Sequence, residues 1–143
     1  MKVALYAQTY SEDVLAPARE LLIALEEAGA EVFIEGAFAE YMQQPEGHSR
    51  FVQRHGLDDS FDLLVSIGGD GTILRAITYI RDLGIPIVGV NTGRLGFLSI
   101  FPKDAARKLV SEFMAGNYHL VERTLVQADF AGNTPGGDAL NFA

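Results

Sequence analysis

The sequence predicts an α/β fold: a doubly wound, Rossmann-like sheet of mostly parallel strands with helices on both faces. Two observations support this. Short apolar segments alternate with amphipathic segments at helical spacing over most of the chain. Glycines follow these segments where a strand would turn into a helix or a helix would end. The length of 143 residues suits one domain, because domains usually span roughly 100 to 200 residues.

The first third of the chain predicts a strand, a helix and a second strand. Residues 2–7 and 31–34 are short apolar runs that favour strands. Between them, residues 17–28 have the spacing of an amphipathic helix, and Gly29 follows where a helix C-cap is expected. The apolar face of this helix holds Leu21, Leu22, Leu25 and Ala28. Residues 38–55 receive no assignment, because a Pro-Glu-Gly sequence interrupts them.

The middle of the chain repeats this order. Residues 61–67 are mostly apolar on both alternating faces, as in a central strand of a parallel sheet. Residues 73–83 have helical spacing, and residues 86–90 form the next buried run. A second glycine-rich loop follows at residues 91–96, and residues 104–114 predict a further helix. Repeated strand, helix and strand units of this kind indicate a doubly wound sheet.

The pattern changes after residue 118. Residues 120–130 read as an extended segment, and residues 132–137 are rich in turn residues. We assign residues 1–125 to an α/β nucleotide-phosphate-binding domain and residues 126–143 to the start of a second domain or a linker. Because the sequence stops soon after a loop, we expect it to be the N-terminal part of a larger protein.

Composition argues against several classes of function. The formal net charge is -8, and no cluster of Lys and Arg offers the basic face that nucleic acid requires. No apolar run approaches the ~18 residues of a membrane span, and the N-terminus lacks the features of a signal peptide. The chain has no cysteine, so it has neither disulfides nor thiolate metal sites. We expect a soluble, cytoplasmic protein that binds neither nucleic acid nor membranes.

The turn from Gly68 to Thr72 is the first candidate site. Gly68, Gly69 and Gly71 let a phosphate approach the backbone, and the start of the following helix directs its N–H groups to the same place. Asp70 is unexpected there, because a carboxylate repels phosphate unless it binds a metal ion or transfers a proton. The alternative is that Asp70 only caps the helix, but Thr72 already offers a capping hydroxyl at this junction.

The turn and the second loop together carry a family resemblance. Gly68-Gly69-Asp70-Gly71-Thr72 matches the signature of NAD kinases, diacylglycerol and sphingosine kinases and, less closely, phosphofructokinases. Residues 89–98, Gly-Val-Asn-Thr-Gly-Arg-Leu-Gly-Phe-Leu, resemble the NAD kinase motif, whereas lipid kinases have a Gly-Thr-Gly-Asn stretch here. Residues 122–125 also resemble the segment that leads out of the first NAD kinase domain. The similarity extends over residues 2–129.

This resemblance implies transfer of the terminal phosphoryl group of ATP, or of polyphosphate, to the adenosine 2'-hydroxyl of NAD, with a divalent cation such as Mg²⁺. Asp70 would be the general base. Arg75 would lie near the dinucleotide and Phe97 would face the nucleotide base. The implied ligand-binding residues are Gly68, Gly69, Gly71, Thr72, Arg75, Asn91 and Phe97.

Each of these roles has a structural alternative. Arg75 could be a solvated helix residue, and Phe97 could pack in the core with Leu95 and Leu98. Arg94 could brace the loop. The three histidines, His48, His55 and His119, have no ligand spacing, so we predict no protein metal site.

The sequence departs from the family at its end. NAD kinases have an Asn-Glu pair at the start of a β-rich second domain, whereas Asn141 is followed by Phe142. We expect that domain to be missing and the fragment to be inactive alone, with the full-length protein forming a homo-oligomer. Two other functions stay open, a lipid kinase of the diacylglycerol type and a non-catalytic nucleotide-binding domain of the same fold.

Overall fold

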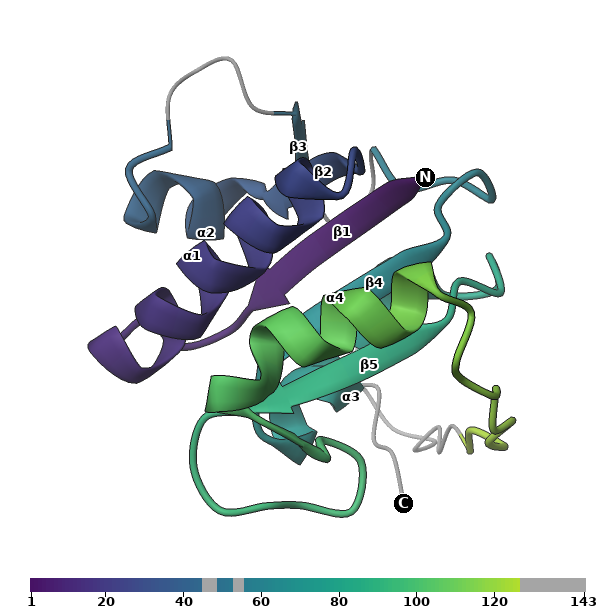
Figure 1. Cartoon of the computed structure of the whole chain (residues 1–143). Coiled ribbons are helices and arrows are strands. Elements are labelled where there is room, and N and C mark those ends of the chain that lie inside the picture. The colour runs from purple at the N-terminus through teal and green to yellow at the C-terminus, as the bar shows by residue number, and fades with distance from the viewer. Residues whose placement is uncertain (45–48, 53–55, 127–143) are drawn as a thin grey trace, which may run out of the picture.

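The computed structural model of the chain describes residues 1–44, 49–52 and 56–126. In this part of the chain a 6-stranded sheet forms, and every neighbouring pair of strands is parallel (Figure 1). The strands are β1 (Lys2–Ala7), β2 (Glu31–Glu35), β3 (Ser49–Phe51), β4 (Leu63–Gly68), β5 (Ile87–Asn91) and β6 (Phe101–Pro102). Their order across the sheet is β3-β2-β1-β4-β5-β6.

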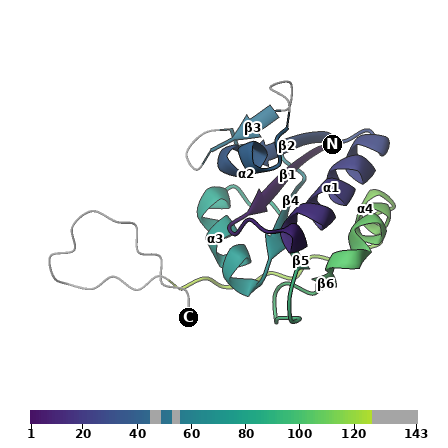
Figure 2. The same ribbon diagram turned by 90° about the vertical axis from the view of Figure 1, so that its left-hand side faces the viewer.

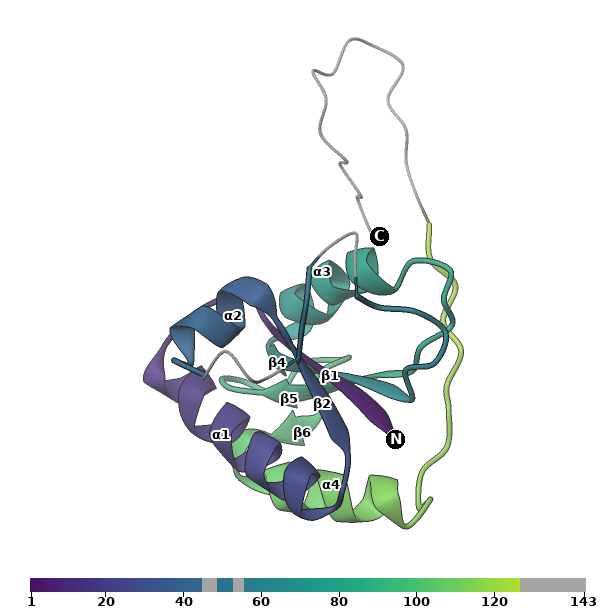
Figure 3. The same ribbon diagram turned by 90° about the horizontal axis from the view of Figure 1, so that it is seen from above.

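Helices cover both faces of this sheet. They are α1 (Glu12–Glu27), α2 (Gly36–Tyr41), α3 (Asp70–Ile80) and α4 (Ala106–Met114), with a short 3-10 helix η1 (Lys103–Ala105) before α4. Seen from above, α1 and α4 lie on one side of the sheet and α3 on the other (Figure 3), and the side view shows the same three layers (Figure 2). The predicted doubly wound α/β fold is therefore confirmed.

Two apolar clusters hold the layers together. The cluster on the α1 side includes Leu21, Leu25, Val65 and Ile67, each 0% exposed. The cluster on the α3 side includes Ala4, Leu64, Ala76 and Ile80. All residues of β4 are buried: Leu63, Val65 and Ile67 enter the first cluster and Leu64 enters the second. This explains why the segment is apolar on both faces.

The strand order reverses between β1 and β4. After β1 the chain passes to α1 on one face, and after β4 it passes to α3 on the other. In doubly wound sheets, ligands bind beyond the carboxyl ends of the strands at such a point. The turn after β4 and the loop after β5 both leave the sheet at this edge (Figure 1).

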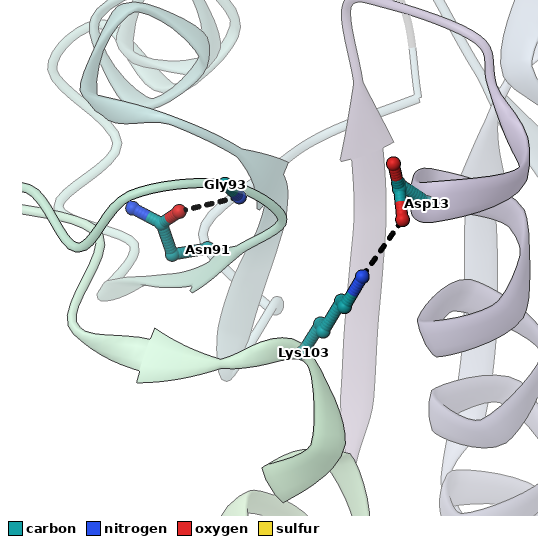
Figure 4. Close-up of polar contacts among 4 residues, drawn as sticks. All are labelled: Asp13, Asn91, Gly93 and Lys103. Atoms are coloured by element: carbon teal, nitrogen blue, oxygen red, sulfur yellow. Dashed lines mark hydrogen bonds and ion pairs between the residues drawn. The ribbon is translucent and has the colours of Figure 1, made fainter.

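Ion pairs on the surface join α1 to the segment after β6. The Lys103 ammonium lies 2.7 Å from the Asp13 carboxylate (Figure 4), and the Arg107 guanidinium lies 2.9 Å from the Glu27 carboxylate. All four side chains are more than half exposed, so each pair adds little to stability.

The first helix starts earlier than the sequence predicts. It begins at Glu12 rather than at residue 17, so Pro17 lies inside it. A proline at this position removes one backbone hydrogen bond. The extra turn buries Val14 and Leu15, which extends the apolar face of the helix and offsets that loss.

The unassigned region and the C-terminal region are described in part. Residues 38–55 contain most of α2 and all of β3, the latter pairing with β2 at the edge of the sheet. Residues 117–126 carry neither helix nor strand, and the predictions for residues 127–143, including Asn141, lie outside the described residues. The division into residues 1–125 and 126–143 stays a prediction. No helix in the described ranges is both long and apolar enough to cross a membrane.

Candidate functional site

The Asp70 carboxylate joins the turn after β4 to the loop after β5. The backbone N–H of Phe97 donates to Oδ2 at 2.9 Å. The N–H groups of Leu98 and Ser99 donate to Oδ1 at 3.0 and 2.9 Å. Three consecutive N–H groups of the loop after β5 therefore bind the carboxylate of the turn after β4.

These contacts set the charge of Asp70. The N–H of Ser99, followed by that of Phe97, lowers the pKa of the Asp70 carboxyl, and that of Leu98 adds to this effect. Desolvation opposes the shift but is outweighed. A carboxylate that accepts several backbone N–H bonds stays ionised, because each bond favours the charged form.

The capping interpretations of Asp70 and Thr72 are wrong. Helix α3 begins at Asp70 and ends at Ile80, instead of spanning residues 73–83, and Gly69 is its N-cap. No side chain makes a capping hydrogen bond at this end. Asp70 does not cap because its carboxylate accepts from the loop after β5, and Thr72 does not because it lies inside the helix, buried against Gly68.

Ser99 makes further contacts that fasten the same two loops. Its hydroxyl donates to the carbonyl of Gly68 at 3.1 Å, and its own carbonyl accepts from Asn91 Nδ2 at 3.2 Å. Asn91 in turn accepts from the N–H of Gly93 through Oδ1 at 2.8 Å (Figure 4). Asn91 and Ser99 are 3% and 0% exposed, so this network is internal. Nothing in the sequence marks Ser99 as functional beyond its place beside the second motif.

Two glycines are required because atoms of this network approach the backbone closely. A Cβ at Gly96 would lie against all three carboxylate atoms of Asp70. A Cβ at Gly89 would lie 2.7 Å from both Cα and Oγ of Ser99. These glycines of the second motif therefore make room for the residues that connect the loops.

Gly69 and Gly71 differ, because a Cβ at either position has no heavy atom within 4 Å. The space beside the backbone is open at the start of α3, where the first N–H groups of a helix have no intrahelical partner. A positive dipole end and free donors in open space suit an anion. This arrangement fits the phosphate role predicted for the turn.

Arg75 and Phe97 lie at the surface. Phe97 is 94% exposed, so the alternative that it packs in the core is wrong. Leu95 is also exposed, at 66%. Arg75 is exposed on α3. Burial raises the pKa values of the Tyr6 and Tyr79 phenols, and the positive charge of Arg75 opposes this rise. The ligand contacts predicted for Arg75 and Phe97 stay predictions.

No group of three or more His, Cys, Asp or Glu side chains in the described ranges could hold a metal ion. His119 is exposed, and His48 and His55 lie outside the described residues. The described residues therefore offer no cage for a divalent cation.

Comparison with known proteins connects this geometry with a family. Residues 3–118 match the ATP-NAD kinase N-terminal domain. The chain belongs to the NAD kinase family. The NAD kinase of Christiangramia forsetii is 38% identical over 130 residues, which cover 88% of this chain and 44% of the relative. That of Flavobacterium johnsoniae is 34% identical over 147 residues, which cover 100% of this chain and 50% of the relative.

The chain thus spans about half the length of these NAD kinases. Among solved structures, yeast NADH kinase complexed with NADH matches with a TM-score of 0.62 and 23% identity, over 80% of this chain and 36% of that protein. This likeness shows that the two proteins share the same fold. The family resemblance predicted from the two glycine-rich segments is confirmed.

Proposed function

We propose that this chain provides the phosphate site and the general base of an NAD kinase, which transfers the terminal phosphoryl group of ATP to the adenosine 2'-hydroxyl of NAD. The observation that carries the proposal is the position of Asp70. Its carboxylate lies between the open glycine turn and the loop that displays Phe97. A base between a phosphate site and an acceptor site is the arrangement that phosphoryl transfer to a hydroxyl needs.

The hydrogen bonds of Asp70 indicate which oxygen would act. A carboxylate has about four lone-pair positions, two on each oxygen. Oδ1 accepts two N–H groups, whereas Oδ2 accepts one, from Phe97. We infer that the remaining position on Oδ2 accepts the proton of the acceptor hydroxyl.

The 2'-oxygen of NAD forms a bond to the γ-phosphorus while the bond from that phosphorus to the β,γ-bridging oxygen breaks, and ADP leaves. The hydroxyl proton passes to Asp70 Oδ2. A lowered pKa makes Asp70 a weak base, which suffices because phosphoryl transfer depends mainly on positioning and on neutralising charge.

Further ligand roles follow from the family resemblance. Gly69, Gly71 and the first N–H groups of α3 would bind the ATP phosphates. Arg75 would pair with a phosphate of the dinucleotide, and Phe97 would contact its base. A divalent cation such as Mg²⁺ would arrive on the nucleotide. Polyphosphate as an alternative donor, a homo-oligomeric full-length enzyme and a cytoplasmic location are further expectations.

The proposed kinase activity can be tested in a chimera of this chain with the remaining half of a related NAD kinase. We expect the 143 residues alone to be inactive, because the NAD kinases that they match are about twice as long. Joining them to the remaining half of the Flavobacterium johnsoniae NAD kinase should give ATP-dependent formation of NADP. Asp70→Asn should lower this rate by about 10²- to 10⁴-fold, the usual contribution of a general base.

The control is Asp82→Asn, which removes the same charge from an exposed residue just beyond the other end of α3. It should retain activity. The proposal is wrong if the folded chimera makes no NADP, or if Asp70→Asn retains the wild-type rate. Parallel assays test polyphosphate as the donor and NADH or a diacylglycerol as the acceptor. Phosphorylation of the diacylglycerol without phosphorylation of NAD would identify a lipid kinase.

A further inference from the structure

We propose that Ser99 is a positioning residue, which holds the Asp70 carboxylate in its reactive place by fastening the loop after β5 to the phosphate turn. The role of Asp70 as a base rests on the proposed function. The contacts that carry the proposal are internal to the chain and can be tested without substrate.

All three polar groups of Ser99 are engaged, each with a different element. Its N–H donates to Asp70 on α3, its hydroxyl donates to the Gly68 carbonyl at the end of β4, and its carbonyl accepts from Asn91 at the end of β5. The residue is 0% exposed, so water does not compete for these groups. Ser99 therefore connects two neighbouring strands and the first residue of α3.

The hydroxyl of Ser99 provides a link that does not depend on charge. In the described part of the chain, the other polar contacts between residues 96–99 and the turn all end on the Asp70 carboxylate. When that carboxylate accepts a proton, its bonds to the three N–H groups weaken, because charge-assisted hydrogen bonds are the stronger ones. The bond from Ser99 Oγ to Gly68 persists, so the loop stays in place until the proton leaves.

Packing prevents Ser99 from moving toward the sheet. The backbone of Gly89 on β5 lies so close that a Cβ there would be 2.7 Å from Ser99 Cα. A residue held by packing and by hydrogen bonds of its hydroxyl, its N–H and its carbonyl is suited to orienting a reacting group. Removal of its hydroxyl should therefore loosen the Asp70 contacts without removing any of their donors.

The test compares Ser99→Ala with Ser111→Ala. Ser111 is a matched control, because its hydroxyl also donates to a backbone carbonyl, that of Lys108 at 2.9 Å, on the exposed side of α4. In the 143-residue chain, NMR would follow the titration of the Asp70 carboxyl and the hydrogen exchange of the amides of residues 97–99. In Ser99→Ala the pKa of Asp70 should rise, and these amides should exchange about fivefold faster, as the loss of one hydrogen bond implies. Ser111→Ala should change neither.

Unchanged values in folded Ser99→Ala would overturn the proposal. If Ser99→Ala does not fold, Asn91→Ala is used instead, because it removes the donor to the Ser99 carbonyl. The proposal fails unless this variant raises the pKa of Asp70 and speeds the exchange of the amides of residues 97–99. In the chimera, Ser99→Ala should lower kcat by about tenfold and leave KM for ATP unchanged, as expected when orientation rather than binding is lost. An inactive chimera with a raised Asp70 pKa in Ser99→Ala would refute the kinase proposal while supporting the link itself.

Discussion

Replacing Gly71 with alanine should separate phosphate binding from fold stability. Gly71 is the second residue of α3, and a Cβ there meets no heavy atom within 4 Å. Alanine is favoured over glycine by roughly 0.5–1 kcal/mol inside a helix. In the first turn we expect the lower value, about 0.5 kcal/mol, which would raise Tm by about 1–2 °C.

The same Cβ would occupy the open space that a phosphate needs to reach the first N–H groups of α3. Loss of one hydrogen bond to a charged group costs about 1.5–3 kcal/mol, so Kd for ATP should rise by about 10- to 150-fold. Circular dichroism gives Tm, and an NMR titration of the 143-residue chain with ATP or inorganic triphosphate gives the affinity.

Gly29→Ala provides the opposite control. Gly29 follows α1 with φ of +77° and also has open space around it. Alanine is strained in this left-handed conformation, so we expect a loss of about 1 kcal/mol in stability with unchanged affinity for ATP. If Gly71→Ala binds ATP as tightly as the wild type does, the assignment of the phosphate site to this turn is wrong.

Three further predictions concern stability. Gly89→Ala should lower the free energy of unfolding in urea by about 1–3 kcal/mol, because its Cβ would overlap Ile73 and Ser99; an unchanged midpoint would mean that the loop is not held there. Ser66→Ala should raise Tm, because the Ser66 hydroxyl is fully buried and has no partner among the described residues; a lower Tm would indicate a hydrogen bond at this site. Acid unfolding should depend on Asp70, whose pKa is lowered from 3.8 chiefly by the Ser99 and Phe97 N–H groups. The stabilising effect of the Asp70 carboxylate is present above pH 3.8 and is lost as the pH falls through the lower pKa of the folded state. When the pH is lowered from 4, the free energy of unfolding of Asp70→Asn should therefore fall less than that of the wild type. Denaturant unfolding at each pH gives this free energy. An equal dependence on pH in the two proteins would contradict the role of these contacts.

Most of the element order and the family could be predicted from the sequence, whereas α2 and β3 lie largely in the region without an assignment and the two-residue β6 was not predicted. Apolar periodicity is local, so residues 2–7 and the apolar segment that contains β4 could be identified as strands without any tertiary information. The glycines on either side of an unexpected carboxylate likewise predicted a functional role for Asp70. The start of α1 was predicted wrongly at Pro17, because burial of Val14 and Leu15 extends the helix back to Glu12.

The contacts of Asp70 and the exposure of Phe97 depend on the tertiary structure. The donors to Asp70 are backbone N–H groups of residues 27 to 29 positions further along the chain. Every residue except proline carries such a group, so the identities of Phe97, Leu98 and Ser99 do not reveal the contact. It arises because β4 and β5 are adjacent and parallel, which brings the turn after one strand beside the loop after the other.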